Sequence, residues 1–166
     1  MTSKSGEPFK ILFVCTGNTC RSPLAEVLTR RAVERIGWEH VEVSSAGVAA
    51  ADDAPASPES LRVAECHGLD LSGHRSARLS LPLVEWADLI LTMSPGQLSS
   101  VQAAEGASKA SVITDFVRGS EGRDESVCDG VPDPLGGGDE EYEGTYRQLT
   151  DLVDRVLVRL APLVAP

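Results

Sequence analysis

The segment Phe13–Ser22, FVCTGNTCRS, constrains the fold of this chain more than any other, because it joins two patterns of different period. Before it, Lys10–Val14 (KILFV) is a short apolar run with β-branched and aromatic residues, which is typical of a buried strand. After it, apolar residues recur every four positions, which predicts an amphipathic helix. These residues are Leu24, Leu28, Ala32 and Ile36. The segment is therefore expected to be the turn between a buried strand and a helix.

The expected helix carries recognisable signals at both ends. Ser22 is expected to cap its N-terminus, and Pro23 suits its first turn. Gly37 is expected to end it. The helix therefore begins inside the segment that carries the cysteines and the arginine.

Strand and helix patterns alternate along the rest of the chain. Three further strands are expected, at Val41–Ser45, Leu89–Met93 and Ser111–Thr114. Further helices are expected to begin at Ser57-Pro58-Glu59 and end at Gly68, to span Pro82–Ala87, and to open at Ser94-Pro95. The apolar face of a long C-terminal helix consists of Tyr142, Tyr146, Leu149, Val153, Val156 and Leu160. This alternation predicts an α/β fold, a doubly wound four-stranded parallel sheet with helices on both faces.

The segment from Asp115 to Gly138 is longer than an ordinary loop, so it is expected to be either functional or loosely ordered. A chain of 166 residues is long enough to bury one full core. We therefore expect a short tail over residues 1–8 and a single domain over residues 9–163.

Composition and charge exclude several classes of protein. No apolar stretch approaches the roughly 20 residues that cross a membrane, and the N-terminal MTSKSGEPFK lacks the apolar segment of a signal peptide. A net charge of −10 argues against nucleic acid, for which a basic face is the usual footprint. These features favour a cytoplasmic protein that binds neither membrane nor nucleic acid.

The four cysteines are expected to be free thiols, as is usual in a cytoplasmic chain. Their spacing lacks the paired arrangement of a zinc site. Neither a metal nor another cofactor is expected.

The turn itself is suited to an anion. Ligands of open α/β sheets bind at the carboxyl ends of the strands, where backbone N–H groups and the positive end of a helix can converge on a phosphate. Gly17 and Asn18 tolerate the left-handed conformation that such a loop needs. No G-x-x-x-x-G-K-[ST] pattern is present, so a nucleotide P-loop is excluded. The expected phosphate-binding residues are Thr16, Gly17, Asn18, Thr19, Cys20, Arg21 and Ser22.

Cys15 and Arg21 form the C-x₅-R pattern of a thiol nucleophile with a phosphate clamp. A helix N-terminus and a nearby cation favour the thiolate form of a cysteine, and the planar guanidinium of Arg21 can hold two phosphate oxygens. Ser22 can donate a hydrogen bond to the sulfur. The pattern therefore favours attack on phosphorus and a phosphocysteine intermediate. The competing interpretation is a buried structural cysteine.

Two further roles follow from this chemistry. Asp133, before Pro134, is a candidate for the acid that protonates the leaving group, although Asp-Pro is also a common turn signal. Cys15 and Cys20 share one tight loop, so mild peroxide is expected to join them in a reversible disulfide. The alternative is that Cys20 only packs beneath the loop.

With Cys15-Thr-Gly-Asn-Thr-Cys-Arg21-Ser22-Pro23 near its start and Asp133-Pro134 before its last helix, the chain resembles the low-molecular-weight protein-tyrosine-phosphatases. The resemblance also covers Ser44–Gly47 and Gly73–Arg75. It implies the fold described above, with Cys15 as nucleophile, Arg21 as phosphate binder and Asp133 as general acid. It further implies that Asn18, Ser45 and His74 form a hydrogen-bond network supporting the loop.

The variable positions of the pattern indicate the substrate. Tyrosine-specific members of this family typically carry a bulky aliphatic residue where this chain has Thr19, and aromatic residues after the Asp-Pro pair. Here Leu135 and three glycines follow Asp133-Pro134, which leaves little flat surface for a tyrosine ring. The pattern resembles the protein-arginine-phosphatase branch, although Leu135 departs from the aromatic residue often found there. Thr19 and Leu135 are therefore the expected selectivity residues.

The resemblance implies phosphorylated proteins as substrates, most of all proteins that carry phosphoarginine. A monomer is expected, although the sequence itself does not specify the oligomeric state. A protein-tyrosine-phosphatase of the same family is the main alternative. An arsenate reductase would need a relay of further cysteines, and Cys66 and Cys128 lie far apart in the sequence. A phosphate-binding module without catalysis would be expected to lack Cys15 or Asp133.

Overall fold

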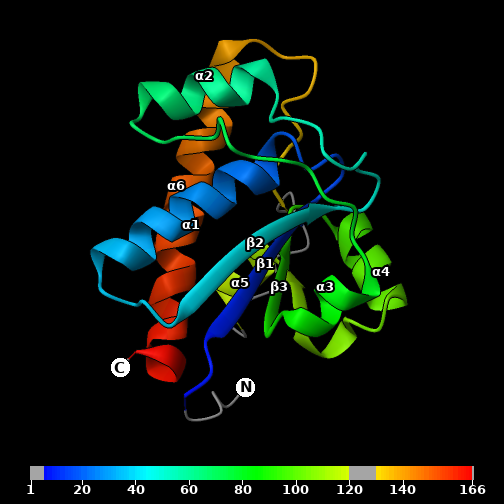
Figure 1. Cartoon of the computed structure of the whole chain (residues 1–166), viewed down its shortest axis with the longest axis vertical. Coiled ribbons are helices and arrows are strands. Elements are labelled where there is room, and N and C mark those ends of the chain that lie inside the picture. The colour runs from blue at the N-terminus through cyan, green and yellow to red at the C-terminus, as the bar shows by residue number, and fades with distance from the viewer. Residues whose placement is uncertain (1–5, 120–129, 166) are drawn as a thin grey trace.

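A four-stranded parallel sheet organises the chain, and Figure 1 shows the computed structural model, which describes residues 6–119 and 130–165. The strands are β1 (Phe9–Cys15), β2 (Val41–Gly47), β3 (Leu89–Thr92) and β4 (Ala110–Val112). They lie in the order β2-β1-β3-β4, and all three pairings are parallel. Strand β1 is thus central, so the loop that follows it opens at the middle of the carboxyl edge of the sheet.

Six α-helices and one 3₁₀ turn connect the strands in the described part of the chain. They are α1 (Arg21–Arg35), α2 (Pro58–Cys66), α3 (Leu81–Trp86), α4 (Pro95–Ala103), the turn η1 (Ala107–Lys109), α5 (Ile113–Arg118) and α6 (Asp139–Val164).

Helices cover both faces of the sheet because successive side chains of a strand point to opposite sides. In β1, Ile11 and Phe13 belong to the larger core, which is formed with α1, α5 and α6. Leu12 and Val14 belong to a second core beneath α3 and α4. Figure 1 shows α1 and α6 on one side of the strands and α3 on the other. The predicted doubly wound fold is confirmed.

The predicted apolar face of the C-terminal helix is also confirmed, because all six of its residues are buried. The fourth strand was predicted too far along the chain. It ends at Val112, and Ile113 and Thr114 begin α5, where both are buried. Both residues are β-branched and favour strands, but their packing in the helix overrides that preference. The segment predicted to be irregular therefore begins with helix, and residues 120–129 of it lie outside the described part.

The expected cap of α1 was also wrong. The N-cap lies two residues earlier, at Cys20, so the helix begins at Arg21, and the Cys20 side chain makes no capping hydrogen bond. Ser22 instead turns its hydroxyl towards Cys15.

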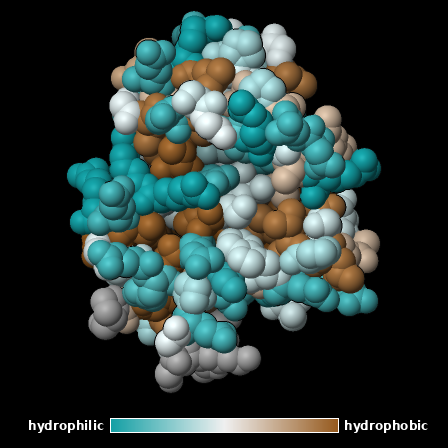
Figure 2. Space-filling view, in the orientation of Figure 1, coloured by the Kyte–Doolittle hydropathy of each residue, from teal (hydrophilic) through white to brown (hydrophobic). Residues whose placement is uncertain are grey.

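Hydrophilic residues cover much of the face shown in Figure 2, and patches of hydrophobic residues show between them. Among the described residues, no helix is both long enough and apolar enough to cross a membrane.

Candidate active site

Cys15 ends the central strand, and its sulfur lies inside the loop that leads to α1. The residue is 2% exposed. The N–H group of Asn18 donates a hydrogen bond to Cys15 Sγ at 3.2 Å, and Ser22 Oγ lies 2.9 Å from the same sulfur. Two hydrogen-bonding groups of the loop thus surround the sulfur.

Asn18 holds the shape of the loop. Its backbone is left-handed, with φ at 55°, and it is fully buried. The side-chain Nδ2 donates to Ser22 Oγ at 2.8 Å and to Ser45 Oγ at 2.9 Å, and Oδ1 accepts from the N–H of Ala77 at 2.9 Å. The backbone oxygen lies 2.7 Å from His74 Nε2. The structure thus joins Asn18, Ser45 and His74, the three residues that were expected to support the loop.

Gly17 differs from the expectation, because Asn18 is the loop residue with a positive φ and Gly17 is not. A Cβ at Gly17 would meet no atom closer than 3.6 Å, so nothing in the structure explains a glycine there.

Gly47 at the end of β2 is the glycine that the loop does require. A Cβ added there would lie 2.5 Å from the carbonyl oxygen of Thr16 and 2.9 Å from the nitrogen of Asn18. Both are backbone atoms of the loop, so a side chain at residue 47 must displace the loop itself.

Gly47→Ala is therefore expected to lower kcat/KM by roughly 10- to 100-fold, the cost of misplacing reacting groups by about 1 Å. The rate on para-nitrophenyl phosphate and the melting temperature measure this. Gly96→Ala is the matched control, since its Cβ would meet nothing closer than 3.9 Å. Equal activity in the two variants would contradict the role given to Gly47.

Arg21 is buried at the first position of α1, and its guanidinium faces the segment that carries Asp133. Nη1 donates to the carbonyl oxygen of Val131 at 3.0 Å, and Nη2 lies 3.3 Å from Asp133 Oδ2. Among the described residues, no acceptor meets the buried Nε. A buried donor without a partner is costly, so this N–H is suited to an anionic ligand.

Asp133 thus comes to the loop although it lies far along the chain. Its carboxylate is about half exposed, and its Oδ1 accepts from the N–H of Leu135 at 3.0 Å. Val131 fixes the segment, because its N–H donates to the carbonyl oxygen of Met93, just after β3. The structure therefore brings the predicted acid against the predicted phosphate clamp.

The two expected selectivity residues lie nearer the surface. Thr19 is half-buried, and its carbonyl oxygen accepts from the N–H of Ser57 at 2.9 Å. Leu135 is 73% exposed. Thr16, another predicted phosphate-binding residue, is exposed, and its Oγ1 accepts from Gln97 Nε2 at 3.1 Å.

Cys20 is buried, and its sulfur lies 3.2 Å from the hydroxyl oxygen of Tyr142 and 3.4 Å from Ser57 Oγ. Burial and the hydrogen bond to Cys20 raise the pKa of Tyr142 to about 12.

Cys15, Cys20 and Cys66 are free cysteines, and Cys66 is exposed at the end of α2. Cys128 lies outside the described residues.

Several residues that serve the site were missed by sequence reasoning. Glu26 accepts a short hydrogen bond from Ser45 Oγ and forms an ion pair with Arg30 at 2.6 Å. Gln97 holds Thr16 and also accepts from the N–H of Met93. The contacts of Glu26 with Ser45 and of Gln97 with Thr16 join segments that are remote in the sequence. The only available signal was the position of Gln97 just after a strand, at the edge where ligands bind.

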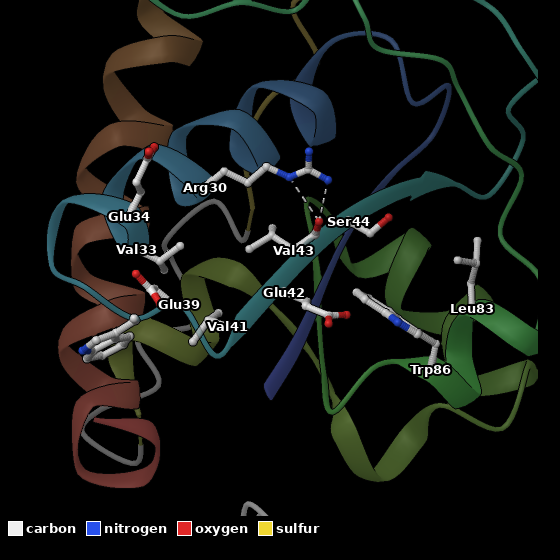
Figure 3. Close-up of a pocket in the computed structure, with 11 residues that line it drawn as sticks. Arg30, Val33, Glu34, Glu39, Val41, Glu42, Val43, Ser44, Leu83 and Trp86 are labelled. Carbon is white, nitrogen blue, oxygen red and sulfur yellow. Dashed lines mark hydrogen bonds between the residues drawn. The ribbon is translucent and has the colours of Figure 1, made fainter. Parts of the chain in front are cut away.

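A separate groove of about 670 Å³ follows the free edge of β2 and reaches Trp86 (Figure 3), and Trp38 also lines it. Arg30 satisfies one backbone acceptor of that strand edge, because its guanidinium donates to the carbonyl oxygen of Val43 at 2.8 Å. None of the predicted site residues lines this groove.

Comparison with known proteins shows the family of the chain. Residues 10–163 match the family described as low molecular weight phosphotyrosine protein phosphatase. The chain is 36% identical over 155 residues to a protein-arginine-phosphatase of Geobacillus stearothermophilus, covering 92% of this chain and 97% of that protein. It is 33% identical over 149 residues to the low molecular weight protein-tyrosine-phosphatase PtpB of Staphylococcus epidermidis, covering 89% and 96%.

The crystal structure of a low molecular weight protein tyrosine phosphatase from T. tengcongensis superposes with a TM-score of 0.82 at 35% identity. The match covers 92% of this chain and 99% of that one. The chain therefore belongs to the low-molecular-weight protein-tyrosine-phosphatase family of cysteine-dependent phosphatases.

Proposed function

We propose that this chain removes phosphoryl groups from arginine side chains of proteins, through a phosphocysteine formed on Cys15. The observation that carries the proposal is the composition of the rim of the site. Thr19 stands half-buried on the loop, and the segment after Asp133 and Pro134 continues as Leu135 and three glycines, without an aromatic residue. Such a rim is polar on one side and open on the other.

In the first step, Cys15 Sγ attacks phosphorus and the bond from phosphorus to the guanidine nitrogen breaks. The electron pair of that bond goes to the nitrogen, which takes a proton from Asp133. Arg21 supports this step, because its buried Nε can donate to a phosphoryl oxygen. Ser22 Oγ, 2.9 Å from the sulfur, stabilises the thiolate before attack.

In the second step, water attacks the phosphocysteine, the S–P bond breaks, and Cys15 returns to its thiolate. Asp133, now ionised, accepts the proton of the water. The ion pair between Arg21 Nη2 and Asp133 Oδ2 suits this exchange of roles. A phosphoryl group bound to Arg21 replaces that contact and releases the carboxyl group to face the leaving atom.

Thr19 selects the substrate in this proposal. A residue on the rim of a loop that encloses the phosphate faces the first atoms beyond the phosphoryl group. In phosphoarginine those atoms belong to a planar, polar guanidinium, whereas in phosphotyrosine they belong to an aromatic ring. A threonine hydroxyl can accept a hydrogen bond from the guanidinium, and an aliphatic side chain cannot.

Phosphotyrosine is the rival substrate. Relatives named as tyrosine phosphatases share about as much identity with the chain as the Geobacillus protein does. The exposed side chain of Leu135 also offers an apolar surface beside the site. Both substrates require the same nucleophile, so only a comparison of rates separates them.

Thr19→Ile is expected to lower kcat/KM on a phosphoarginine peptide by at least about tenfold, since a lost hydrogen-bond partner costs about 1–3 kcal/mol. The rate on the matching phosphotyrosine peptide is expected to hold or to rise, because the added apolar surface favours a ring. Thr19→Val is the control for size, because it removes the hydroxyl and adds no methylene. Equal losses of kcat/KM on both peptides would contradict the role of Thr19 and favour a tyrosine phosphatase instead.

Phosphorylated proteins of the cytoplasm are the proposed partners, and a monomer is the proposed active form. The free cysteines of the described part suit a compartment in which thiols remain reduced. Turnover of para-nitrophenyl phosphate separates this proposal from a module that only binds phosphate.

A further inference from the structure

Tyr142 is a fully buried tyrosine whose hydroxyl group has no part in the mechanism above. It lies in the first turns of α6 with 1% of its surface exposed. Its hydroxyl oxygen is 3.2 Å from the sulfur of Cys20. Buried tyrosine hydroxyls almost always have a hydrogen-bond partner, and here that partner is a thiol of the phosphate loop.

Ser57 completes the contact. Its Oγ accepts a hydrogen bond from the thiol of Cys20, 3.4 Å away, and its N–H donates to the carbonyl oxygen of Thr19 at 2.9 Å. The same Oγ caps α2 by accepting from the N–H of Ser60. Figure 1 shows α2 crossing the N-terminal half of α6. The Cys20 thiol is thus held by two helices.

The two cysteines of the loop are held by different partners. Cys15 Sγ is bonded within the loop, by the N–H of Asn18 and by Ser22. Cys20 Sγ is bonded to Tyr142 and Ser57 outside the loop, and within the loop Thr19 Oγ1 lies 3.7 Å from it. A disulfide requires the two sulfurs to approach to about 2.05 Å. The contacts with Tyr142 and Ser57 are therefore expected to oppose the movement of Cys20 Sγ towards Cys15.

We propose that Tyr142 is a positioning residue that holds Cys20 away from Cys15 and so limits how fast oxidised Cys15 is captured as a disulfide. This inference rests on the proposed role of Cys15 as a thiolate nucleophile. The oxidant is hydrogen peroxide or another hydroperoxide.

The chemistry has two steps. The thiolate of Cys15 attacks one peroxide oxygen, the O–O bond breaks, and the products are a sulfenic acid on Cys15 and hydroxide. Cys20 then attacks the sulfenic sulfur, an S–S bond forms, and the S–O bond breaks. The leaving hydroxide takes the thiol proton and becomes water. Peroxide has then accepted the two electrons lost by the cysteines, and an added dithiol reverses the reaction.

Removing only the phenolic oxygen tests the contact directly. In Tyr142→Phe the ring still fills its place in the core, while Cys20 loses its shortest contact, the one to the Tyr142 hydroxyl, and keeps those to Ser57 and Thr19. A hydrogen bond of ordinary net strength favours the bound position of the thiol over the released one by a factor of about three to ten. Without that bond, the rate of disulfide formation should rise by the same factor. The raised pKa of Tyr142, about 12, keeps the hydroxyl protonated throughout a neutral experiment.

Tyr146→Phe is the matched control. It makes the same change one turn later on the same helix, at a hydroxyl that contacts Arg31 at 3.4 Å and not the loop. Wild type and both variants are treated with dilute peroxide, quenched with iodoacetamide at intervals, and analysed by intact mass and peptide mapping. Cys20→Ser identifies the product formed when no resolving thiol is present.

We expect faster disulfide formation and less sulfinic Cys15 in Tyr142→Phe, with wild-type rates in Tyr146→Phe. An unchanged rate in Tyr142→Phe, a slower one, or equal acceleration in both variants would overturn the inference. So would sulfinic Cys15 without any disulfide in all three proteins. Phosphoarginine hydrolysis by the reduced wild type is measured in parallel. A failure of that activity with the expected disulfide rates would refute the proposed substrate and leave the role of Tyr142 standing.

Discussion

Cys15→Ser is expected to reduce turnover by roughly four to six powers of ten, the usual cost of removing a catalytic nucleophile. A serine hydroxyl is not ionised at neutral pH, so the attacking group is lost although its position is kept. The groups around it remain, namely the N–H of Asn18 and the hydroxyl of Ser22. Binding of inorganic phosphate should therefore persist, or tighten, because a negative charge has been removed from the site.

Two measurements test this expectation together. Turnover of para-nitrophenyl phosphate gives the catalytic loss, and calorimetric titration with phosphate gives the binding. Cys66→Ser is the matched control, because Cys66 is an exposed cysteine at the end of α2. Residual activity of Cys15→Ser above about a hundredth of the wild-type rate would show that another group attacks phosphorus.

The sheet and the position of the loop could be predicted from the sequence because both depend on local pattern. A short run with four consecutive apolar residues, Ile11–Val14, and a change of period are sufficient to place a strand, a turn and a helix. The period of the expected helical stripe was nevertheless misleading. Steps of four residues drift by about 40° each, so Ile36 lies roughly 120° around the helix from Leu24. In the structure Ile36 lies just beyond the end of α1 and is 51% exposed, whereas Leu24 is fully buried.

The support of the loop could not be predicted from the residues alone because it depends on contacts between remote segments. His74 and Glu26 have no local feature that separates them from surface residues. Their roles follow from the strand order, which places the end of β2 beside the end of β1. There Ser45 lies between Asn18 and Glu26 and joins the loop to α1. His74 was identified only through the family resemblance, and Glu26 was not identified.

The Ser22 hydroxyl shows how two correct rules can compete. Serine before a helical pattern usually caps the helix, and that role was predicted here. The structure directs the hydroxyl to Cys15 and Asn18, while α1 begins without a side-chain cap. The hydroxyl of Ser22 thus contacts the sulfur of the site, although helix stability alone would favour its use as a cap. Departures of this kind are expected at functional sites.

Asp133→Ala is expected to lower kcat on phosphoarginine peptides by roughly 10²–10⁴, the usual contribution of general acid catalysis. The loss should depend on the leaving group. Para-nitrophenolate departs readily without a proton, so its rate should fall less. A guanidine nitrogen is a strong base and cannot depart as an anion, so its rate should fall most.

The ion pair with Arg21 complicates this test, because removing Asp133 also frees the clamp. The two effects can be told apart because one changes phosphate binding and the other changes kcat. A freed Arg21 binds phosphate at least as tightly, whereas a lost acid lowers kcat and leaves binding unharmed. Asp133→Asn separates them further, since the amide oxygen can still accept from the N–H of Leu135 but the side chain supplies no acidic proton.

Asp139 provides the control and the rival acid. It lies at the start of α6, where its carboxylate pairs with Arg62 at 2.8 Å and faces α2 rather than Arg21. Asp139→Ala should therefore keep the wild-type rate on every substrate. Weakened phosphate binding in Asp133→Asn would show that the residue holds the ligand rather than donating a proton. If the loss in Asp133→Ala were the same for para-nitrophenyl phosphate as for phosphoarginine, the carboxyl group would be a structural partner of Arg21. The proton donor would then have to be sought in another group that faces the phosphate loop.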